Sequence, residues 1–357
     1  MMQISPETQL FIREHSSDDV RVLALQAKKY PDIDMPTAIT QIAGRKVAAE
    51  KIPSWWEIEK IWYPKHLSLE QCSSEITARY KARLLQGDSL TDLTGGFGID
   101  CSFLATGFKS ATYVERQEEL CEIAAHNFPV LNLNHINIKN EDGVTYLQAM
   151  SPVDCLFLDP ARRNEHGGKT VAISDCEPNV AELEELLLQK ANRVMIKLSP
   201  MLDLSLALKE LKQTQEVHIL SVNNECKELL ILLGQTSPTE ISIHCVNLST
   251  KGTQEEQHFV FTREQEQCSE CTYTDSLETY LYEPNASLLK AGAFRSIAAA
   301  YPVRKLHPNS HLYTSDTFIE NFPGRIFRIV NQCSFNKKEV KENLADLKKE
   351  NVTVRNF

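Results

Sequence analysis

The stretch that most constrains the fold is residues 88–98, Asp-Ser-Leu-Thr-Asp-Leu-Thr-Gly-Gly-Phe-Gly. A short predicted strand over 90–93 carries Asp92 and runs directly into three glycines within four positions, followed by a predicted helix over 99–106. Glycine has no Cβ, so the backbone of such a strand-to-helix turn can closely approach a ligand. The turn therefore predicts a nucleotide-type ligand site, and a glycine-rich turn without a ligand is the simpler alternative.

Two ligands compete for a turn of this kind, a dinucleotide and S-adenosylmethionine (SAM). The dinucleotide fingerprint requires a third glycine three residues after the second glycine of its spaced pair. If Gly96 and Gly98 form that pair, Cys101 stands in the third position. The sequence therefore favours SAM over a nicotinamide cofactor.

The order of the predicted elements indicates an α/β core. Residues 1–85 are predicted to be helical, with one helix over 67–85, and from residue 90 short β-rich runs alternate with helical runs. Such alternation predicts a parallel sheet with helices on both faces and ligands at the carboxyl ends of its strands. The predicted strands are 90–93, 111–115, 136–140, 154–159, 193–198, 216–222 and 227–234. The last of these follows too closely for a helical crossover, so we expect it to run antiparallel.

Beyond residue 235 the predicted elements no longer alternate between strand and helix. Residues 240–247 and 258–262 alternate like the strands of a hairpin. Residues 277–330 have a mixed α+β pattern that includes one predicted helix over 286–301. A second, smaller α+β region is therefore expected near the C-terminus.

Acidic residues mark the ends of the predicted strands. Glu115 ends the second strand, where a carboxylate can accept hydrogen bonds from both ribose hydroxyls of a nucleoside. Asp142 follows the third strand; it could accept a hydrogen bond from an adenine amine or instead cap the next helix. The fourth strand is hydrophobic and ends on Asp159-Pro160.

The segment Asp159-Pro160-Ala161-Arg162 resembles the Asp-Pro-Pro-aromatic motif of amino-methylating enzymes. In those families the motif holds the acceptor amine near the sulfonium methyl group, so catalysis is by positioning, with the reacting atoms about 3–3.5 Å apart. The aromatic residue that would stack on a flipped base is missing here, which counts against N6-methylation of a base. Arg162 and Arg163 could instead meet a phosphate or a carboxylate, or pair with Glu165.

Together these segments resemble the class I SAM-dependent methyltransferases that carry a C-terminal THUMP-like domain. The resemblance rests on residues 69–75 with Tyr80 and Lys81, 92–98, 159–162, 197–203, and 282–285 with 322–325. It implies a Rossmann-like, seven-stranded methyltransferase core, a helical N-terminal region and a small ferredoxin-like and THUMP-like C-terminal region. THUMP domains proper bind structured RNA, so the resemblance implies RNA as the substrate class.

The resemblance also implies roles for individual residues. Asp92, Thr94, Gly95, Gly96 and Gly98 would cradle the methionine portion of SAM, Glu115 would hold the ribose, and Asp142 would read the adenine. Asp159, Pro160 and Arg162 would form the catalytic motif, in which Asp159 and Pro160 orient the acceptor. No metal is expected.

The resemblance divides the chain into four regions. These are a helical region over 1–85, the methyltransferase domain over 86–264, a ferredoxin-like segment over 275–320 and a THUMP-like domain over 321–357. The chain ends just after a strand predicted over 352–355, so we expect the last domain to be truncated.

Composition bears on location and partners. The net charge is −10, but residues 280–357 contain 12 Lys and Arg against 7 Asp and Glu, an excess that fits either a polyanion partner or a solvated face. Ten scattered cysteines, with no signal-peptide pattern and no long apolar run, predict a cytoplasmic protein with reduced thiols. Cys268 and Cys271 have metal-like spacing but lack a second ligand pair.

The main hypothesis is an RNA methyltransferase. A methyltransferase of protein or small molecules and an RNA-binding protein with a vestigial core are the alternatives.

Overall fold

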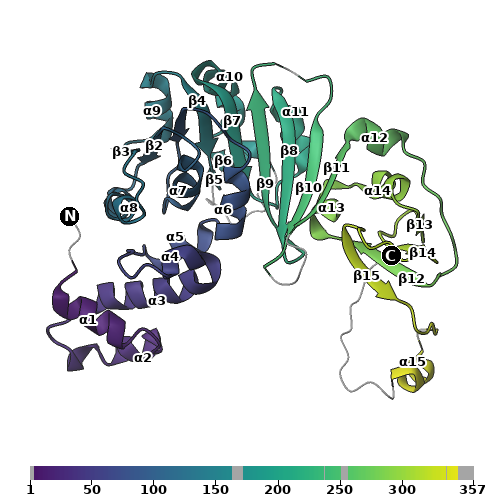
Figure 1. Cartoon of the computed structure of the whole chain (residues 1–357), viewed down its shortest axis with the longest axis horizontal. Helices are drawn as coiled ribbons and strands as arrows, with labels where there is room; N and C mark the ends of the chain where they lie inside the picture. The colour runs from purple at the N-terminus through teal and green to yellow at the C-terminus, as the bar shows by residue number, and fades with distance from the viewer. Residues whose placement is uncertain (1–3, 163–171, 237, 251–255, 335, 345–357) are drawn as a thin grey trace. The chain divides into compact units, whose positions relative to one another are not determined.

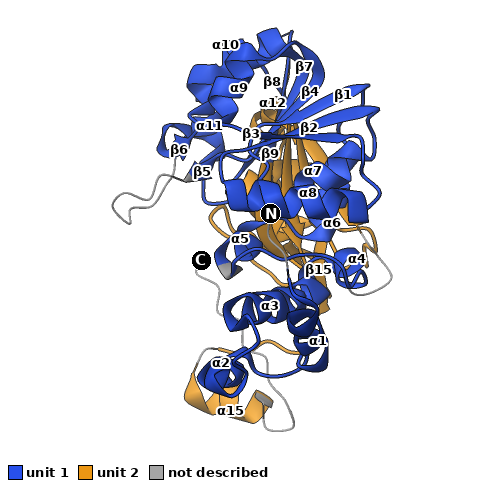
Figure 2. Cartoon of the chain, turned by 90° about the vertical axis from the view of Figure 1, so that its left-hand side faces the viewer, with its two compact units in different colours: residues 1–215, 230–238 blue, residues 216–229, 239–357 orange. Residues whose placement is uncertain are grey.

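The computed structural model describes residues 4–162, 172–236, 238–250, 256–334 and 336–344 (Figure 1). The strand predicted over 352–355 and Arg163 lie outside these residues. The described residues divide into two compact units, 1–215 with 230–238 and 216–229 with 239–357 (Figure 2). No helix among the described residues is long and apolar enough to cross a lipid bilayer.

The N-terminal part of the first unit is helical, as predicted. Its elements are α1 (Pro6–Glu14), α2 (Val20–Leu25), η1 (Ala27–Lys29), α3 (Met35–Lys51), α4 (Pro53–Trp56), α5 (His66–Gln71) and α6 (Glu75–Ala82). Trp55 is buried in a cluster with Tyr63 and Phe97, and its ring meets Phe97 edge-on at a centroid distance of 5.2 Å. Because Phe97 belongs to the glycine turn, the helical region packs against that turn and stabilises it.

The single helix predicted over 67–85 is wrong, because α5 and α6 are separated by residues 72–74. The first helix, α5, ends at Gln71, and Ser74 directly precedes α6. The interruption turns the side chain of Ser73 into the protein interior, where it is 4% exposed. The break therefore delivers a hydroxyl group to the buried network described below.

The α/β core follows the predicted alternation. Its elements are β1 (Ser89–Asp92), α7 (Ile99–Ala105), β2 (Ser110–Glu115), α8 (Glu118–Val130), β3 (Ile136–Asn140), α9 (Gly143–Ala149), β4 (Val153–Leu158), β5 (Ala161–Arg162), η2 (Ile173–Asp175), β6 (Cys176–Glu177), α10 (Val180–Lys190), β7 (Ala191–Leu198), α11 (Leu204–Glu210), β8 (Thr214–Val222), β9 (Glu225–Gly234), β10 (Ser242–Leu248) and β11 (Glu256–Thr262). The main sheet has nine strands in the order β11-β10-β8-β9-β7-β4-β1-β2-β3. The predicted Rossmann-like core is confirmed.

Two features complete this sheet. Strands β8 and β9 are adjacent and joined by Asn223 and Asn224, both with positive φ, so β9 runs antiparallel to β8 as predicted. The sheet has two strands more than the predicted seven, because the predicted hairpin β10–β11 joins it through parallel pairing of β10 with β8.

The C-terminal part of the second unit forms a separate antiparallel sheet in the order β13-β14-β12-β15. Its elements, with the helix that precedes it, are α12 (Arg263–Cys268), β12 (Tyr280–Pro284), α13 (Ala286–Ala291), α14 (Phe294–Ala300), β13 (Arg304–Lys305), β14 (Tyr313–Ser315), β15 (Gly324–Arg328) and α15 (Lys337–Leu344). The single helix predicted over 286–301 is divided, because Gly292 adopts a left-handed φ of 76° and ends α13.

Candidate active site

The glycine turn follows β1 and leads into α7. Gly96 has a φ of 54°, a conformation that favours glycine, and the nearest atom to a Cβ built on it is Thr94 O at 3.8 Å. A Cβ on Gly95 would instead lie 2.2 Å from the ring of Tyr113. The backbone at Gly95 is therefore packed directly on β2, whereas the backbone at Gly96 faces open space that a ligand can enter.

Asp92, at the end of β1, is 1% exposed. Its Oδ1 accepts a hydrogen bond from Thr94 N at 3.0 Å, and its Oδ2 has no hydrogen-bond partner among the described residues. Burial, together with the negative charges of Asp100, Asp159 and Glu115, raises the pKa of Asp92 well above its ordinary value, and the Thr94 amide only partly opposes this. A buried polar atom of this kind is available to a ligand.

Glu115 ends β2 and is 8% exposed. Its Oε2 accepts a hydrogen bond from Gly96 N at 2.9 Å, and its Oε1 accepts one from Gln117 N at 2.8 Å. Each carboxylate oxygen can accept a second hydrogen bond. Glu115 thus ties the glycine turn to the end of the neighbouring strand and keeps acceptor capacity for the hydroxyls of a nucleoside.

Asp142 caps α9. Its Oδ1 accepts hydrogen bonds from Val144 N and Thr145 N, both at 3.0 Å. The next residue, Gly143, allows close contact, because a Cβ there would lie 2.1 Å from Leu93 O. The loop after β3 is therefore packed on the loop after β1, and the helix-capping role foreseen as an alternative for Asp142 is present.

Asp159 follows β4 and is joined to the glycine turn through its backbone. Its amide donates a hydrogen bond to Thr94 Oγ1 at 2.6 Å, and its Oδ2 forms an ion pair with Lys197 Nζ at 2.5 Å. The side chain of Asp159 is 36% exposed, so the carboxylate borders both the protein interior and solvent. Pro160 is buried and Arg162 lies in β5; the side chain of Arg162 is outside the described structure.

Behind Asp159 lies a buried network of two lysines, one aspartate and one serine. Asp100 Oδ1 pairs with Lys81 Nζ at 2.9 Å, and Asp100 Oδ2 pairs with Lys197 Nζ at 3.2 Å. Ser73 Oγ donates to Asp100 Oδ2 at 2.7 Å and accepts from Lys81 at 2.8 Å and Lys197 at 3.1 Å. With Asp159 included, two positive and two negative charges balance, which is the condition for burying them.

The charges of this network set the pKa values of its two carboxylates in opposite directions. Burial alone would raise the pKa of Asp100, but the ammonium groups of Lys81 and Lys197 outweigh burial and hold that pKa below its ordinary value. Burial raises the pKa of Asp159, and Lys197 opposes the shift. Asp100 is therefore the fixed counter-charge of both lysines, and Lys197 links it to the partly exposed Asp159.

The structure brings most of the sequence-predicted residues together at the carboxyl ends of β1, β2 and β4. Hydrogen bonds connect Asp92 to Thr94, Thr94 to Asp159, and Glu115 to Gly96. Ser73, Lys81, Asp100 and Lys197 were not predicted as site residues. The sequence held one sign of this network. Lys197 is a charged residue near the end of the apolar run Val-Met-Ile-Lys-Leu, and because a lysine is rarely buried without a partner, it indicates a buried acidic partner.

Comparisons with known proteins agree with this architecture. A family model described as a ferredoxin-like domain matches residues 280–323. The crystal structure of a "putative methyltransferase" from Porphyromonas gingivalis W83 is 34% identical, covers 97% of this chain and 87% of its own, and has a TM-score of 0.83. No curated protein matches this chain.

Two further solved structures are similar over a smaller part of the chain. An rRNA methylase from Streptococcus thermophilus is 14% identical over 44% of this chain and 93% of its own, with a TM-score of 0.32. A "putative methyltransferase" from Streptococcus mutans in complex with SAH is 14% identical over 45% and 96%, with a TM-score of 0.33. From the identity and coverage of the P. gingivalis protein, this chain belongs to the same family, methyltransferases with a Rossmann-like core and a ferredoxin-like domain.

Proposed function

We propose that this protein is a SAM-dependent methyltransferase that acts on RNA. One observation carries the proposal: the glycine turn, Glu115 and Asp159 are tied to one another at one edge of the sheet. In open α/β sheets, ligands bind outside the carboxyl ends of the strands, which is where these groups lie. The family membership supports methyl transfer as the reaction.

The residues at this edge fit SAM. The backbone at Gly96 borders open space, Asp92 Oδ2 is buried without a hydrogen-bond partner in the part of the chain that the structure describes, and Glu115 retains acceptor capacity. We assign the methionine portion to Asp92, Thr94 and the three glycines, the ribose to Glu115, and the adenine to the loop that contains Asp142. SAM supplies an electrophilic methyl group on its sulfonium.

Asp159 has the role of orienting the acceptor. Its Oδ2 is held by Lys197, and in this assignment its Oδ1 accepts a hydrogen bond from the N–H of the acceptor. The backbone carbonyl of Pro160 supplies a second acceptor in this assignment, and Arg162 meets a phosphate or carboxylate of the substrate. This is catalysis by positioning, and Lys197 contributes by fixing the carboxylate in one orientation.

The second unit offers features that favour RNA as the substrate. On β15, Phe327 is 44% exposed, and the guanidinium of Arg325 lies 5.8 Å from the centre of its ring. Arg325 also pairs with Glu283, Arg328 is exposed as the next residue of β15, and α15 begins with Lys337 and Lys338. Exposed aromatic rings flanked by arginines are typical of surfaces that stack bases and neutralise phosphates.

Calorimetric titration of the purified chain with S-adenosylhomocysteine (SAH) tests the cofactor. We expect Glu115→Gln to weaken SAH binding about 10- to 100-fold, because hydrogen bonds to a charged acceptor contribute about 1.5–3 kcal/mol. Glu118→Gln, at an exposed position on α8, is the matched control and should bind normally. No SAH binding by the wild type, or equal binding by the Glu115→Gln variant, would contradict the cofactor assignment.

Asp159→Ala tests the acceptor site separately. We expect this variant to lose methyl transfer while SAH binding stays unchanged, because Asp159 orients the acceptor and not the cofactor. Unaltered turnover would remove Asp159 from the mechanism.

A further inference from the structure

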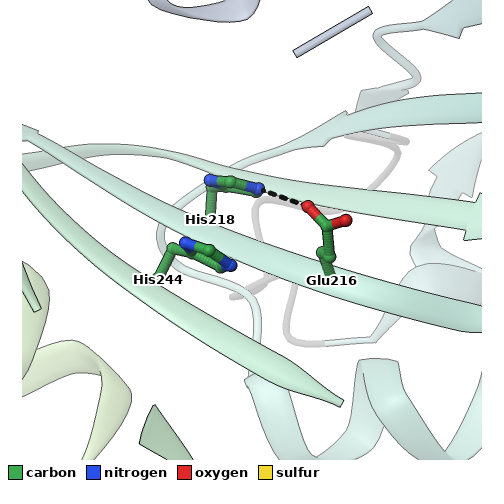
Figure 3. Close-up of side chains that lie close together, drawn as sticks. All are labelled: Glu216, His218 and His244. Atoms are coloured by element: carbon green, nitrogen blue, oxygen red, sulfur yellow. Dashed lines mark hydrogen bonds and ion pairs between the residues drawn. The ribbon is translucent and has the colours of Figure 1, made fainter. Parts of the chain in front are cut away.

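A second group of chemically active side chains lies on β8, β10 and β11, all within the second unit. Figure 3 shows Glu216 and His218 from β8 beside His244 from β10. The parallel register pairs His218 with His244, and Glu216 is two residues before His218, so the three side chains share one face of the sheet. His258 of β11 is on the same face, because it lies two residues from Val260, the partner of His244.

The potential ligand atoms of Glu216, His218 and His244 all lie within 4.8 Å of one another. His218 Nε2 is 3.3 Å from Glu216 Oε2, and the rings of His218 and His244 are stacked with centroids 4.3 Å apart. Ligands at about 2.0–2.1 Å from a tetrahedral zinc ion are separated by about 3.3 Å. The carboxylate and the first imidazole already have that separation, and the ligand atom of the second imidazole lies within 4.8 Å of both.

His218 is 2% exposed, and a buried polar ring is stable only when its nitrogen atoms have partners. Glu216 is a partner of the His218 ring and His258 is a partner of the His244 ring, so polar groups gather on this face of the sheet.

We propose that Glu216, His218 and His244 form a binding site for a divalent zinc-class ion. Two imidazoles and one carboxylate are nitrogen and oxygen donors typical of zinc, whereas calcium and magnesium require mostly oxygen donors. Three protein ligands leave a fourth position for water or for an external ligand, as in open zinc sites. The side chain of Glu216 is 33% exposed, which gives the ion access.

His258 supports the site from outside it. Its Nε2 lies 3.1 Å from His244 Nδ1, so it can fix the orientation of the His244 ring. Residues that orient a metal-bound imidazole in this way typically contribute 10- to 100-fold to metal affinity. His258→Gln should therefore weaken metal binding by about that factor, and loss of a direct ligand should weaken it further.

The experiment must separate this site from the thiols of the chain. Cys268 is exposed and Cys271 is half-buried, and their spacing suits zinc. The full chain carrying Cys268→Ser and Cys271→Ser is stripped with a chelator and titrated with Zn²⁺ against a chromophoric competitor. Titration with Co²⁺ then reports the ligand type, because a thiolate ligand gives a charge-transfer band and nitrogen and oxygen ligands do not.

The proposal predicts one equivalent of zinc in this background and cobalt spectra without a thiolate band. Glu216→Gln and His244→Gln should each lower zinc affinity by more than about 100-fold, beyond the effect of an orienting residue. His311→Gln, an exposed histidine of the same unit stacked on Phe294, is the control and should bind normally.

Thermal unfolding shows whether the variants still fold and whether zinc stabilises them. Zinc should raise the Tm of the Cys268→Ser/Cys271→Ser chain and of its His311→Gln variant, but not of its Glu216→Gln variant. Glu216 is partly exposed, so this substitution leaves the core intact. Absence of zinc binding in the double-serine background, or zinc binding that survives both Glu216→Gln and His244→Gln, would overturn the proposal.

Discussion

Lys81 provides a sharp test of how the buried charges hold the first unit together. Its side chain is fully buried, and its Nζ pairs with Asp100 Oδ1 at 2.9 Å and donates to Ser73 at 2.8 Å. Lys81→Met keeps most of the side-chain volume but leaves the Asp100 carboxylate buried with Lys197 as its remaining ammonium partner. We expect the free energy of unfolding to fall, because a buried charge then lacks part of its compensation.

The magnitude follows from this burial. Removing one partner of a buried ion pair typically costs about 3–5 kcal/mol. For a folding unit of this size, about 1 kcal/mol corresponds to about 2–4 °C in Tm, so the Tm of Lys81→Met should fall by about 6–20 °C. In the Asp100→Asn background the same lysine has lost its carboxylate partner, so replacing it by methionine should cost little or even stabilise the fold.

A double-mutant cycle measures this difference directly. Thermal unfolding of the wild type, the two single variants and Lys81→Met/Asp100→Asn is followed by circular dichroism at neutral pH. We expect a coupling free energy of about 3–5 kcal/mol between the two sites, which is the difference between these two costs and lies at or above the upper end for residues in contact. Two results would refute the view that Asp100 is destabilised when it is buried without Lys81. One is a stability loss in the double variant that equals the sum of the two single losses. The other is a fall in Tm of less than a few degrees for Lys81→Met.

Three further predictions concern the proposed ligand sites. The pKa of Asp92 is raised in the folded state, so its stabilising effect is lost as pH rises above its unfolded value of about 3.9; the Tm of Asp92→Asn relative to wild type should therefore increase with pH, and a pH-independent difference would contradict this. Gly96→Ala should cost about 1–2 kcal/mol for its left-handed φ and weaken SAH binding, whereas Gly107→Ala, whose Cβ would make only ordinary van der Waals contacts at 3.7 and 3.9 Å, should do neither. Phe327→Ala should weaken RNA binding in a filter assay by about 1–3 kcal/mol, and an equal loss for the exposed Phe318→Ala would argue against a specific stacking role.

The sequence was sufficient for the core of the fold because its signals are local. The strands of the α/β part are short β-rich runs that alternate with helical runs, and the acidic ends at Asp92, Glu115 and Asp159 mark the edge where the ligand groups meet. The two helices predicted over 67–85 and 286–301 were each wrong because a short break divides them. Residues 72–74 interrupt one predicted helix and Gly292 the other, and helical periodicity alone does not detect a break that preserves the apolar stripe.

The buried network could not be predicted in the same way. Ser73, Lys81, Asp100 and Lys197 come from the break between α5 and α6, from α6, from α7 and from β7, and only the packing of α6 against α7 and the pairing of β4 with β7 bring them together. Register explains the last contact: Leu158 pairs with Ile196, so the next residues, Asp159 and Lys197, lie side by side. The histidine cluster depends equally on register, because His218 and His244 meet only when β10 joins β8 in parallel.

Methyl transfer into RNA is the central claim, and one measurement tests it most directly. The purified protein is incubated with SAM carrying a tritium-labelled methyl group and an extract of cells that lack the protein, and the products are divided between ribonuclease and protease. The account predicts label that ribonuclease alone removes and that the Asp159→Ala variant does not transfer. Label removed only by protease would assign the acceptor to protein, and no incorporation by the wild type into either fraction would contradict an RNA methyltransferase.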